Sequence, residues 1–307
     1  MFAPALKYFP WIGPDNRVSW LKLVVFVALF MPGLWVAYQF DQDMLGPRPL
    51  NQSIHEIGLW TIRLLLVTMA ITPLRQILRW PELILVRRMI GVAVFIYLLI
   101  HLFLYTADEK FNLLKVVSEI YLRIYLTIGF TALIGLAVLT ITSTDGMIAR
   151  IGGKAWRRLH KLIYAIAVLG IIHFYMQAKA NVWEPMWMAG LFSWLIAYRV
   201  VASRRKPGKA PAAANLPWLV GLALFAAAFT AIGEAVYFWV LMGVDPLVLL
   251  RVNLGTMAGI RPSWIVFGGG LAFVLIRSVA IAWKNWQRKA KTVPLEVVAE
   301  TGGRRAN

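Results

Sequence analysis

The stretch VRRMIGVAVFIYLLIHLFLYT, residues 86–106, decides the fold, because two arginines are followed by a long apolar run that carries His101 near its end. A bilayer core about 30 Å thick is crossed by roughly 20 apolar residues in a helix. Such a helix satisfies its backbone hydrogen bonds internally, where lipid offers no partners. We therefore expect residues 86–106 to form a membrane-spanning helix.

Windows of the same character recur along the chain and give eight predicted spans in all. They lie near residues 20–39, 57–77, 86–106, 121–142, 157–177, 184–202, 216–242 and 263–283. Of the 307 residues, 60% are hydrophobic and 15% are charged, which is too little polar surface for a soluble domain of this size. The expected fold class is all-α, a polytopic membrane helix bundle with lipid as its solvent.

The formal net charge of +18 would suggest nucleic acid as a partner in a soluble protein, but here the basic residues occupy alternate loops. Lys and Arg concentrate in the cytoplasmic loops of membrane proteins, so we expect no nucleic acid and place both termini in the cytoplasm. Fewer basic residues are found in the loops near 40–56, 107–120, 178–183 and 243–262, which are expected outside. The cytoplasmic loops are marked by Arg75, Arg79, Arg87, Arg88, Arg150, Lys154, Arg157, Arg158, Arg204, Arg205, Lys206 and Lys209.

The chain divides at a basic, Pro/Ala-rich stretch, residues 204–215, whose composition is typical of a linker. Residues 1–203 contain the first six spans and all four histidines, so we expect this part to carry the chemistry. Residues 216–283 contain two additional spans, and residues 284–307 form a polar, basic tail expected in the cytoplasm. Cysteine is absent, so a redox metal would need histidine or methionine ligands.

Two histidines are predicted to lie at one depth in neighbouring helices. At a rise of 1.5 Å per residue, His101 is about 21 Å from the cytoplasmic start of its span and His173 about 26 Å from the start of its own. Two neutral imidazoles at one level match the bis-histidine ligation of a low-spin b-type haem, which needs no open coordination site for electron transfer. The alternative is that each histidine hydrogen-bonds a neighbouring helix, as polar residues in membrane bundles often do.

His160 lies about 20 Å closer to the cytoplasmic face than His173 and could hold a second cofactor. The two side chains point about 140° apart on an ideal helix, and the residue of span three at the level of His160 is Arg88, preceded by Arg87. Arginine cannot ligate iron, but Arg87, Arg88 and Arg157 could bind a haem propionate or a flavin phosphate. The alternative is an ordinary basic helix flank at the cytoplasmic interface.

Arg63 lies inside span two, where a guanidinium requires an anionic companion. A haem propionate could supply that charge, and Arg123 at the outer end of span four could bind a propionate as well. Glu234 in span seven could instead pair with Arg63 or handle protons. His55 at the outer end of span two could contribute to a quinone site or to a docking surface, although an interfacial histidine needs no special role.

Four runs of the sequence carry a resemblance to a known family: TPLRQ (72–76), RRMIGVAVFIYLLIHL (87–102), YLTIGFTALIGLAVLTITS (125–143) and WRRLHKLIYAIAVLGIIHF (156–174). They resemble the ferric-reductase-like transmembrane proteins of the MsrQ (YedZ) type over about residues 15–203. The most specific element is the pattern W-x-x-L-H-K/N-x-x-Y … I-H, joined to a single histidine on span three.

The resemblance implies a six-helix, ferric-reductase-like haem core followed by two extra C-terminal transmembrane helices. It implies a haem b subunit of the bacterial inner membrane, with one or two haems and with FMN as a further cofactor. Electrons would pass from the quinone pool to a periplasmic molybdopterin enzyme of the MsrP type, which reduces methionine sulfoxide in damaged periplasmic proteins. By motif, His101, His160 and His173 are haem-ligand positions, and His55 matches another histidine of the family.

The sequence departs from the wider ferric-reductase and NADPH-oxidase superfamily, whose ligating helices each carry two histidines, because span three has only one. No glycine-rich nucleotide fingerprint is found, so electrons are expected from a membrane-soluble donor or a separate protein. One alternative function is a self-contained transmembrane ferric reductase, which would need a flavin domain. The other is a proton-coupled transporter, although no convincing internal repeat of the transporter type is found.

Overall fold

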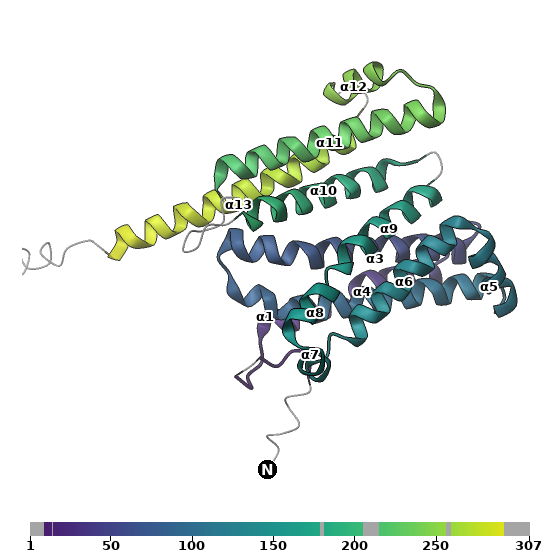
Figure 1. Ribbon diagram of the computed structural model, residues 1–307, viewed down its shortest axis with the longest axis horizontal. Helices are drawn as coiled ribbons and strands as arrows, with labels where there is room; N and C mark the ends of the chain where they lie inside the picture. The colour runs from purple at the N-terminus through teal and green to yellow at the C-terminus, as the bar shows by residue number, and fades with distance from the viewer. Residues whose placement is uncertain (1–8, 14, 179–180, 205–214, 256–258, 292–307) are drawn as a thin grey trace, which may run out of the picture.

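The structure, a computed structural model, consists of helices in its described residues apart from one isolated β-bridge (Figure 1). The described residues are 9–13, 15–178, 181–204, 215–255 and 259–291. Eight helical segments are long and apolar enough to cross a membrane, which confirms the predicted all-α, multi-pass fold. These segments are Trp20–Asp41, Pro49–Leu78, Pro81–Asp108, Ile124–Ile141, Gly153–Ala178, Trp183–Ser203, Leu216–Met242 and Pro262–Gln287.

Some spans contain two helices, and three short helices lie between spans. The first span is built from α1 and α2, the third from η2 and α4, and the fifth from α8 and α9, while α5, α7 and α12 are connectors. The bounds are α1 (Trp20–Ala28), α2 (Met31–Asp41), α3 (Pro49–Leu78), η2 (Pro81–Leu83), α4 (Ile84–Asp108), α5 (Leu113–Leu122), α6 (Ile124–Ile141), α7 (Asp145–Ile151), α8 (Gly153–Leu159), α9 (Leu162–Gln177), α10 (Trp183–Ser203), α11 (Leu216–Met242), α12 (Pro246–Leu254) and α13 (Pro262–Lys291).

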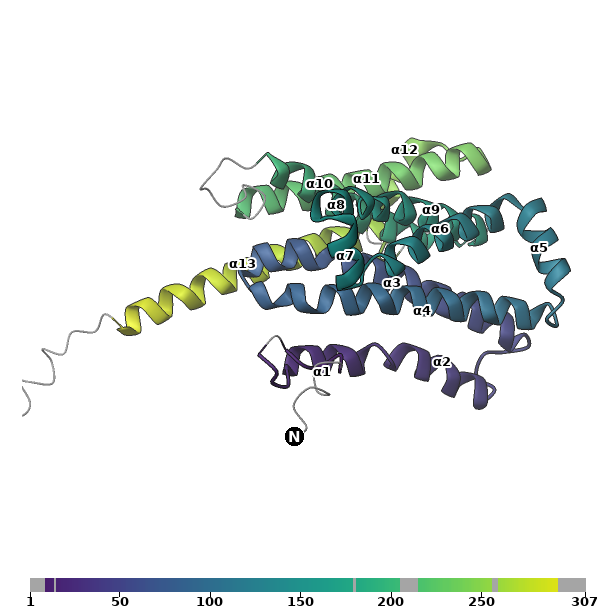
Figure 2. The same ribbon diagram turned by 60° about the horizontal axis from the view of Figure 1, so that its bottom comes forward.

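Helix α3 is the centre of the bundle. It packs most extensively on α4 and also contacts α2, α9, α10 and α13. Helix α6 packs mainly on α9 and touches α4, so α3–α4 and α6–α9 form two neighbouring helix pairs (Figures 1 and 2). The buried apolar core runs through both pairs and includes Ile57, Leu65, Val94, Leu136 and Ile166. In both views α5 lies at one end of the bundle, called here the α5 end, and α7 and α8 lie toward the other, the α8 end.

The two additional spans, α11 and α13, pack closely on each other and on α10, and α13 also reaches α3. Small residues allow this approach, since a Cβ at Gly190 would lie 2.1 Å from Thr230 Oγ1 and a Cβ at Gly270 would lie 2.6 Å from the Ala223 Cβ. Most of the predicted linker and tail lies outside the described residues. The first part of the predicted tail, residues 284–291, instead continues α13 as a helix.

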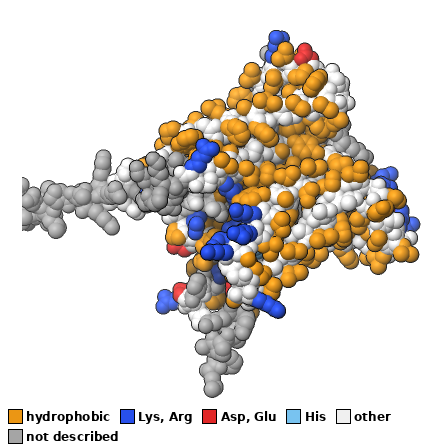
Figure 3. Space-filling model, in the orientation of Figure 1, with side chains coloured by type: hydrophobic (Ala, Val, Ile, Leu, Met, Phe, Trp, Pro, Cys, Tyr) orange, Lys and Arg blue, Asp and Glu red, His pale blue; other side chains and the backbone are white. Residues whose placement is uncertain are grey.

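Basic side chains collect at the α8 end, where the predicted cytoplasmic loops come together. In Figure 3 the largest group of Lys and Arg side chains lies toward this end, and hydrophobic side chains cover most of the helical surface in view. Arg88 forms an ion pair with Asp145 here, with a distance of 2.7 Å, and this contact lowers the pKa of the Asp145 carboxyl. The loops predicted to be cytoplasmic therefore lie at one end of the bundle.

The first span is interrupted between α1 and α2, and a tyrosine from α4 fills the interruption. Pro32 has no N–H to donate to the preceding turn. The Tyr97 hydroxyl donates to the Leu29 carbonyl at 2.8 Å and accepts from the Gly33 N–H at 2.9 Å, so it takes the place of a helical hydrogen bond between those two residues. Gly33 makes room for it, because a Cβ there would lie 3.3 Å from the hydroxyl oxygen. Span one is thereby held on α4.

A second backbone defect lies in α3, where Pro73 stands inside the helix. Proline removes the N–H that would donate to the carbonyl four residues earlier, at Met69. Arg199 of α10 donates its Nη2 to this Met69 carbonyl and its Nη1 to the Leu195 carbonyl of its own helix. The cation therefore satisfies an acceptor that would otherwise be left without a partner in the bundle interior, and it docks α10 on α3.

Replacing Arg199 by Met is expected to destabilise the bundle by about 1–3 kcal/mol, because the Met69 carbonyl then lacks a donor in apolar surroundings. Pro73→Ala restores an N–H at position 73 that can donate to Met69 as in a regular helix. Arg199→Met should therefore lower the free energy of unfolding by less when Pro73 has been replaced by alanine. Unfolding free energies in mild detergent, combined in a double-mutant cycle, measure this difference.

Arg277→Met is the matched control for that cycle. Arg277 donates to the Ile77 carbonyl at 3.1 Å, an acceptor that does not depend on the missing N–H of Pro73. Its substitution should cost the same in both backgrounds. Equal costs of Arg199→Met with and without Pro73 would contradict the role given to Arg199.

Candidate functional site

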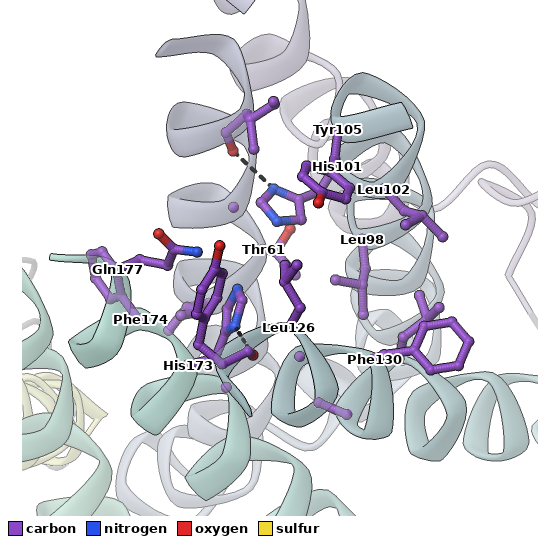
Figure 4. A pocket seen from close by; sticks show the side chains of 18 of the residues that line it. Thr61, Leu98, His101, Leu102, Tyr105, Leu126, Phe130, His173, Phe174 and Gln177 are labelled. Atoms are coloured by element: carbon purple, nitrogen blue, oxygen red, sulfur yellow. Dashed lines mark hydrogen bonds between the residues drawn. The ribbon is translucent and has the colours of Figure 1, made fainter. Parts of the chain in front are cut away.

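A cavity of about 320 Å³ lies between the two helix pairs α3–α4 and α6–α9, near the α5 end. His101 and His173 both line it, and Figure 4 shows their imidazoles within the same space. The interior of the cavity is apolar, with Ile62, Leu65 and Leu136 among its lining residues. The prediction that these two histidines lie at one level agrees with their shared position in this cavity.

The ring of His101 is fixed by the backbone of α3. His101 lies on α4, and its Nδ1 is 2.8 Å from the Ile54 carbonyl oxygen, so the Nδ1–H donates to that oxygen. The ring rests on Gly58, where a Cβ would lie 2.9 Å from the ring carbon Cε1. Glycine is therefore the residue that lets the imidazole approach the helix backbone at this point. This hydrogen bond leaves Nε2, with its lone pair, as the nitrogen that can bind a metal.

The ring of His173 is held in the same way by the other helix pair. Its Nδ1 is 2.7 Å from the Tyr125 carbonyl oxygen of α6, and a Cβ at Gly129 would lie 2.9 Å from its ring atoms. Each histidine thus uses a carbonyl and a glycine four residues further along the partner helix. The two pairs repeat one local arrangement and present one imidazole each, with Nε2 as the remaining ligand atom.

The separation of the two rings fits a single metal ion between them. Their centroids are 6.4 Å apart and their planes are nearly perpendicular, at 88°. A metal–imidazole bond is about 2.0–2.1 Å long and the nitrogen lies roughly 1.1 Å from the ring centroid, so two rings that share a metal have centroids about 6.3 Å apart. Among the described residues there is no group of three or more His, Asp and Glu side chains able to hold a metal ion.

The end of the cavity near α5 is polar. His55, Tyr105, Asp108, Arg123 and Tyr125 line it there. The hydrogen bond from Arg123 Nη1 to the Tyr125 hydroxyl, 3.3 Å, together with the Glu119 carboxylate, raises the pKa of the Arg123 guanidinium. The predicted candidates His55 and Arg123 thus lie where the acidic groups of a cofactor in this cavity would meet water and cations.

Arg63 does not line the cavity, and its anionic companion in the structure is Glu184, whereas the sequence suggested a haem propionate or, alternatively, Glu234. Its Nη2 donates to Glu184 Oε1 of α10 at 3.1 Å, and its guanidinium lies 4.9 Å from the centre of the Trp60 ring. The suggested pairing of Arg63 with Glu234 is therefore wrong. Glu234 is buried and pairs instead with Arg261, and it also accepts from Asn253 at 2.9 Å. These contacts hold α12 and the start of α13 against α11.

The remaining predicted residues lie away from this cavity, toward the α8 end. His160 Nε2 is 3.3 Å from the Thr142 hydroxyl oxygen, and its ring centroid is 3.9 Å from that of Trp156. Arg87 lies near Tyr164 and Arg75 and has no carboxylate partner among the described residues, whereas Arg88 pairs with Asp145. Arg157 is exposed on α8. The structure brings His160 near Arg87 but does not bring it to His101 and His173.

Two features of the site were not visible in the sequence. Gly58 and Gly129 support the imidazoles, and the carbonyls of Ile54 and Tyr125 orient them. The only available signal was the presence of glycines within apolar spans, which also occurs wherever two membrane helices pack closely.

Fold and site together define a membrane helix bundle in which two helix pairs each contribute one backbone-anchored histidine to a shared cavity. The family described as ferric reductase like transmembrane component matches residues 57–171, a region that includes His101 and His160 and ends just before His173. No solved structure shows significant similarity to the chain.

Curated relatives narrow this class. The chain is 38% identical over 193 residues to the protein-methionine-sulfoxide reductase heme-binding subunit MsrQ of Rhodospirillum rubrum. The aligned region covers 62% of this chain and 93% of that relative. The proteins of the same name from Caulobacter vibrioides and Xanthomonas axonopodis pv. citri are 37% and 41% identical, with 61% and 57% of this chain and 89% and 80% of the relatives covered. The chain belongs to the MsrQ family.

The Arg63–Glu184 ion pair is expected to stabilise the bundle by about 1–2 kcal/mol, between the values for exposed and fully buried pairs. Arg63→Met should cost this amount, because it leaves the Glu184 carboxylate without its cation. Adding Glu184→Gln should recover part of the loss, since no unpaired charge then remains. Unfolding free energies of the two single variants and the double variant measure the coupling.

The Arg88–Asp145 pair is the control for this measurement, because both side chains are largely exposed. Solvent screens such a pair, so Arg88→Met and Asp145→Asn should show no measurable coupling. A coupling for Arg63 and Glu184 no larger than that of the control would contradict the proposed contribution.

Proposed function

We propose that the chain is a transmembrane electron-transfer subunit that carries haem b between His101 and His173. It passes electrons from the quinone pool to a periplasmic molybdopterin methionine-sulfoxide reductase of the MsrP type, for the repair of oxidised periplasmic proteins. The observation that carries the proposal is the pair of imidazoles, whose ring centroids are 6.4 Å apart and whose Nδ1 atoms each donate to a backbone carbonyl. The family relationship and the names of the relatives support the same cofactor and reaction system.

The residues present fit a haem. The long apolar interior of the cavity suits a porphyrin ring, and the polar end suits its two carboxylates. Arg123 and His55 are the candidates to meet those carboxylates, while Arg63 is engaged with Glu184. A haem supplies an iron that gains and loses one electron. His101 and His173 would hold this iron through their Nε2 atoms, and two histidine ligands would favour electron transfer over binding of a substrate.

The chain's own residues set the conditions for this transfer. The Ile54 and Tyr125 carbonyls fix the tautomer and orientation of the two imidazoles, so Nε2 of each ring is the metal-binding atom. The apolar lining, with Leu65, Leu136 and Ile166, keeps water from the interior of the cavity. Little needs to move during transfer, because both ligands are already held by the backbone.

We propose that the protein lies in the bacterial inner membrane with the α8 end and both termini in the cytoplasm. The concentration of basic residues at the α8 end supports this orientation. The cavity then lies near the periplasmic face, where a periplasmic acceptor can approach its polar end. Quinol, the proposed donor, reaches the bundle through the lipid.

A second cofactor is proposed at the α8 end, either another haem with His160 as a ligand or FMN. Arg87, which has no carboxylate partner among the described residues, and the exposed Arg157 could bind the carboxylate or phosphate of such a group. Arg88 is already paired with Asp145, which makes it the weaker candidate.

The two alternatives gain no specific support. A proton-coupled transporter would use Arg63, Glu234 and the histidines along a pathway, but Arg63 and Glu234 are each paired with other residues of the protein. The break in the first span is filled by the Tyr97 hydroxyl. A self-contained ferric reductase would need an attached or separate flavin domain, and no contact in the structure specifically favours this function.

The purified wild-type protein is expected to show a haem Soret band and sharp α bands on reduction. His101→Ala and His173→Ala should each lose most of this haem, because each removes one of the two imidazoles that would hold it. His160→Ala, which changes a residue outside the cavity, should retain it. Haem-to-protein ratio and redox titration of the four proteins test these expectations. Full haem content in both cavity variants would overturn the ligand assignment, and a colourless wild type would favour a transporter.

Gly58→Ala and Gly129→Ala are expected to weaken haem binding by about 10–100-fold, the range found when partners of metal ligands are disturbed. The added methyl group would lie 2.9 Å from the ring of His101 or His173 and must displace it from its carbonyl. Gly170→Ala is the control, since Gly170 lines the same cavity but has nothing within 4 Å of an added Cβ. Haem affinity is measured by titration of the haem-free protein. Equal affinities in all three variants would contradict the supporting role of the two glycines.

A further inference from the structure

Helix α5 is too short to cross a membrane and lies between the end of α4 and the start of α6. The sequence predicted only an outer loop at residues 107–120, so this helix is a finding of the structure. Asn112 caps it, accepting from the Lys115 N–H at 3.1 Å. Because α4 and α6 are both membrane spans, α5 lies at the level where the membrane meets water.

The side chains of α5 form three faces around the helix axis, at 100° per residue. One face, with Val116 and Ile120, turns inward, since Val116 is buried and Ile120 lines the cavity. A second, mainly polar face carries Lys115, Ser118 and Glu119, together with Leu122 at the end of the helix. The third face is apolar, and it is made of Leu113, Leu114, Val117 and Tyr121.

This third face, called the outer apolar face, is exposed, and no other described part of the chain covers it. Leu114 is 86% exposed, Tyr121 is 85% exposed, and Leu113 and Val117 are each 65% exposed. Exposure of such a row of large apolar side chains to water would be unfavourable, since it costs a free energy of about 25 cal/mol for each Å² of apolar surface. A continuous exposed apolar surface of this kind is a feature of interaction sites.

The surroundings of the outer apolar face indicate what covers it. On one side, just before α5, the exposed Phe111 contacts the exposed Phe103 of α4, with ring centroids 5.8 Å apart, and on the other side the exposed Ile124 begins α6 directly after Arg123. Both belong to membrane-spanning segments, so their exposed apolar side chains contact lipid. Exposed apolar side chains are therefore found on both spans and on the helix that joins them.

The polar groups of α5 agree with a position at the membrane surface. Lys115 pairs with Glu109 at 2.6 Å, which raises the pKa of the lysine, and Arg123 pairs with Glu119. All four charges lie off the outer apolar face, and Tyr121 is of the residue type enriched at membrane–water interfaces. A separate polar face beside an exposed apolar one is the pattern of helices that lie in the plane of the interface.

We propose that α5 lies in the interface of the membrane with Leu113, Leu114, Val117 and Tyr121 among the lipid acyl chains. Lipid, and not a protein partner, then covers this face. Because Ile120 on the same helix lines the cavity, the membrane itself supports one wall of the site. The proposal concerns the position of α5 and does not depend on the identity of the cofactor.

Single-cysteine variants test this arrangement, because the chain contains no cysteine. Leu114→Cys, Val117→Cys and Tyr121→Cys probe the outer apolar face, and Ser118→Cys on the polar face is the matched control within α5. Phe103→Cys on α4 reports a site in contact with lipid. Each variant is placed in nanodiscs of phosphatidylethanolamine and phosphatidylglycerol and treated with a polar maleimide. Position 118 should react roughly tenfold faster or more than the other four, because apolar surroundings suppress the reactive thiolate.

A nitroxide label at position 117 gives a second measurement that distinguishes lipid from protein cover. In lipid, the label should collide more often with oxygen than with a water-soluble nickel chelate, as at position 103. Reaction of positions 114, 117 and 121 with maleimide as fast as position 118 would overturn the proposal. Slow reaction without preferential oxygen collisions, or protection that appears only after a periplasmic reductase is added, would also overturn it and assign the face to protein. If one variant fails to accumulate, the other two report the same face.

Discussion

A backbone carbonyl inside a membrane has no water from which to accept a hydrogen bond, so a carbonyl that its own helix leaves unpaired must find a donor in the protein. This constraint explains several contacts between the helices. Tyr97 donates to Leu29 at the break in the first span, and Arg199 donates to Met69, four residues before Pro73. At Met69 a neighbouring helix supplies the donor that proline has removed, and at Leu29 it supplies a hydroxyl that bridges a carbonyl and an N–H separated by the break. Each irregularity of a helix is therefore also a point of attachment for another helix.

The two cavity histidines use the same kind of acceptor, but on regular helices. The carbonyls of Ile54 and Tyr125 each accept from an imidazole Nδ1, and the glycine four residues later leaves room for the ring. The contacts that set the register of α4 on α3 and of α9 on α6 are thus the contacts that orient the two Nε2 atoms. Folding of the two helix pairs and preparation of the ligand atoms are one process, which removes the reorganisation that a flexible ligand would require.

The sequence predicts all eight spans, because apolar length is a strong signal when lipid is the solvent. Counting the rise per residue also places His101 and His173 at one level, since depth along a straight helix follows from position alone. The pairing of Arg63 with Glu234 was wrong, because depth does not reveal which helices are neighbours: α10, with Glu184, contacts α3. The roles of the supporting glycines and of helix α5 could not be predicted for the same reason, because they depend on which residues lie beside them.

Contacts within each helix pair, α3–α4 and α6–α9, are more extensive than the contacts between the pairs. The cavity lies at this weaker boundary and receives one imidazole from each side, from His101 and His173. Lipid provides no hydrophobic force that would hold two such pairs together. A group bound to both Nε2 atoms would therefore join the pairs, and its binding free energy would add to the stability of the bundle by linkage. Conversely, a small displacement of one pair would change the separation of the rings, so the packing of the bundle controls the fit of the ligand.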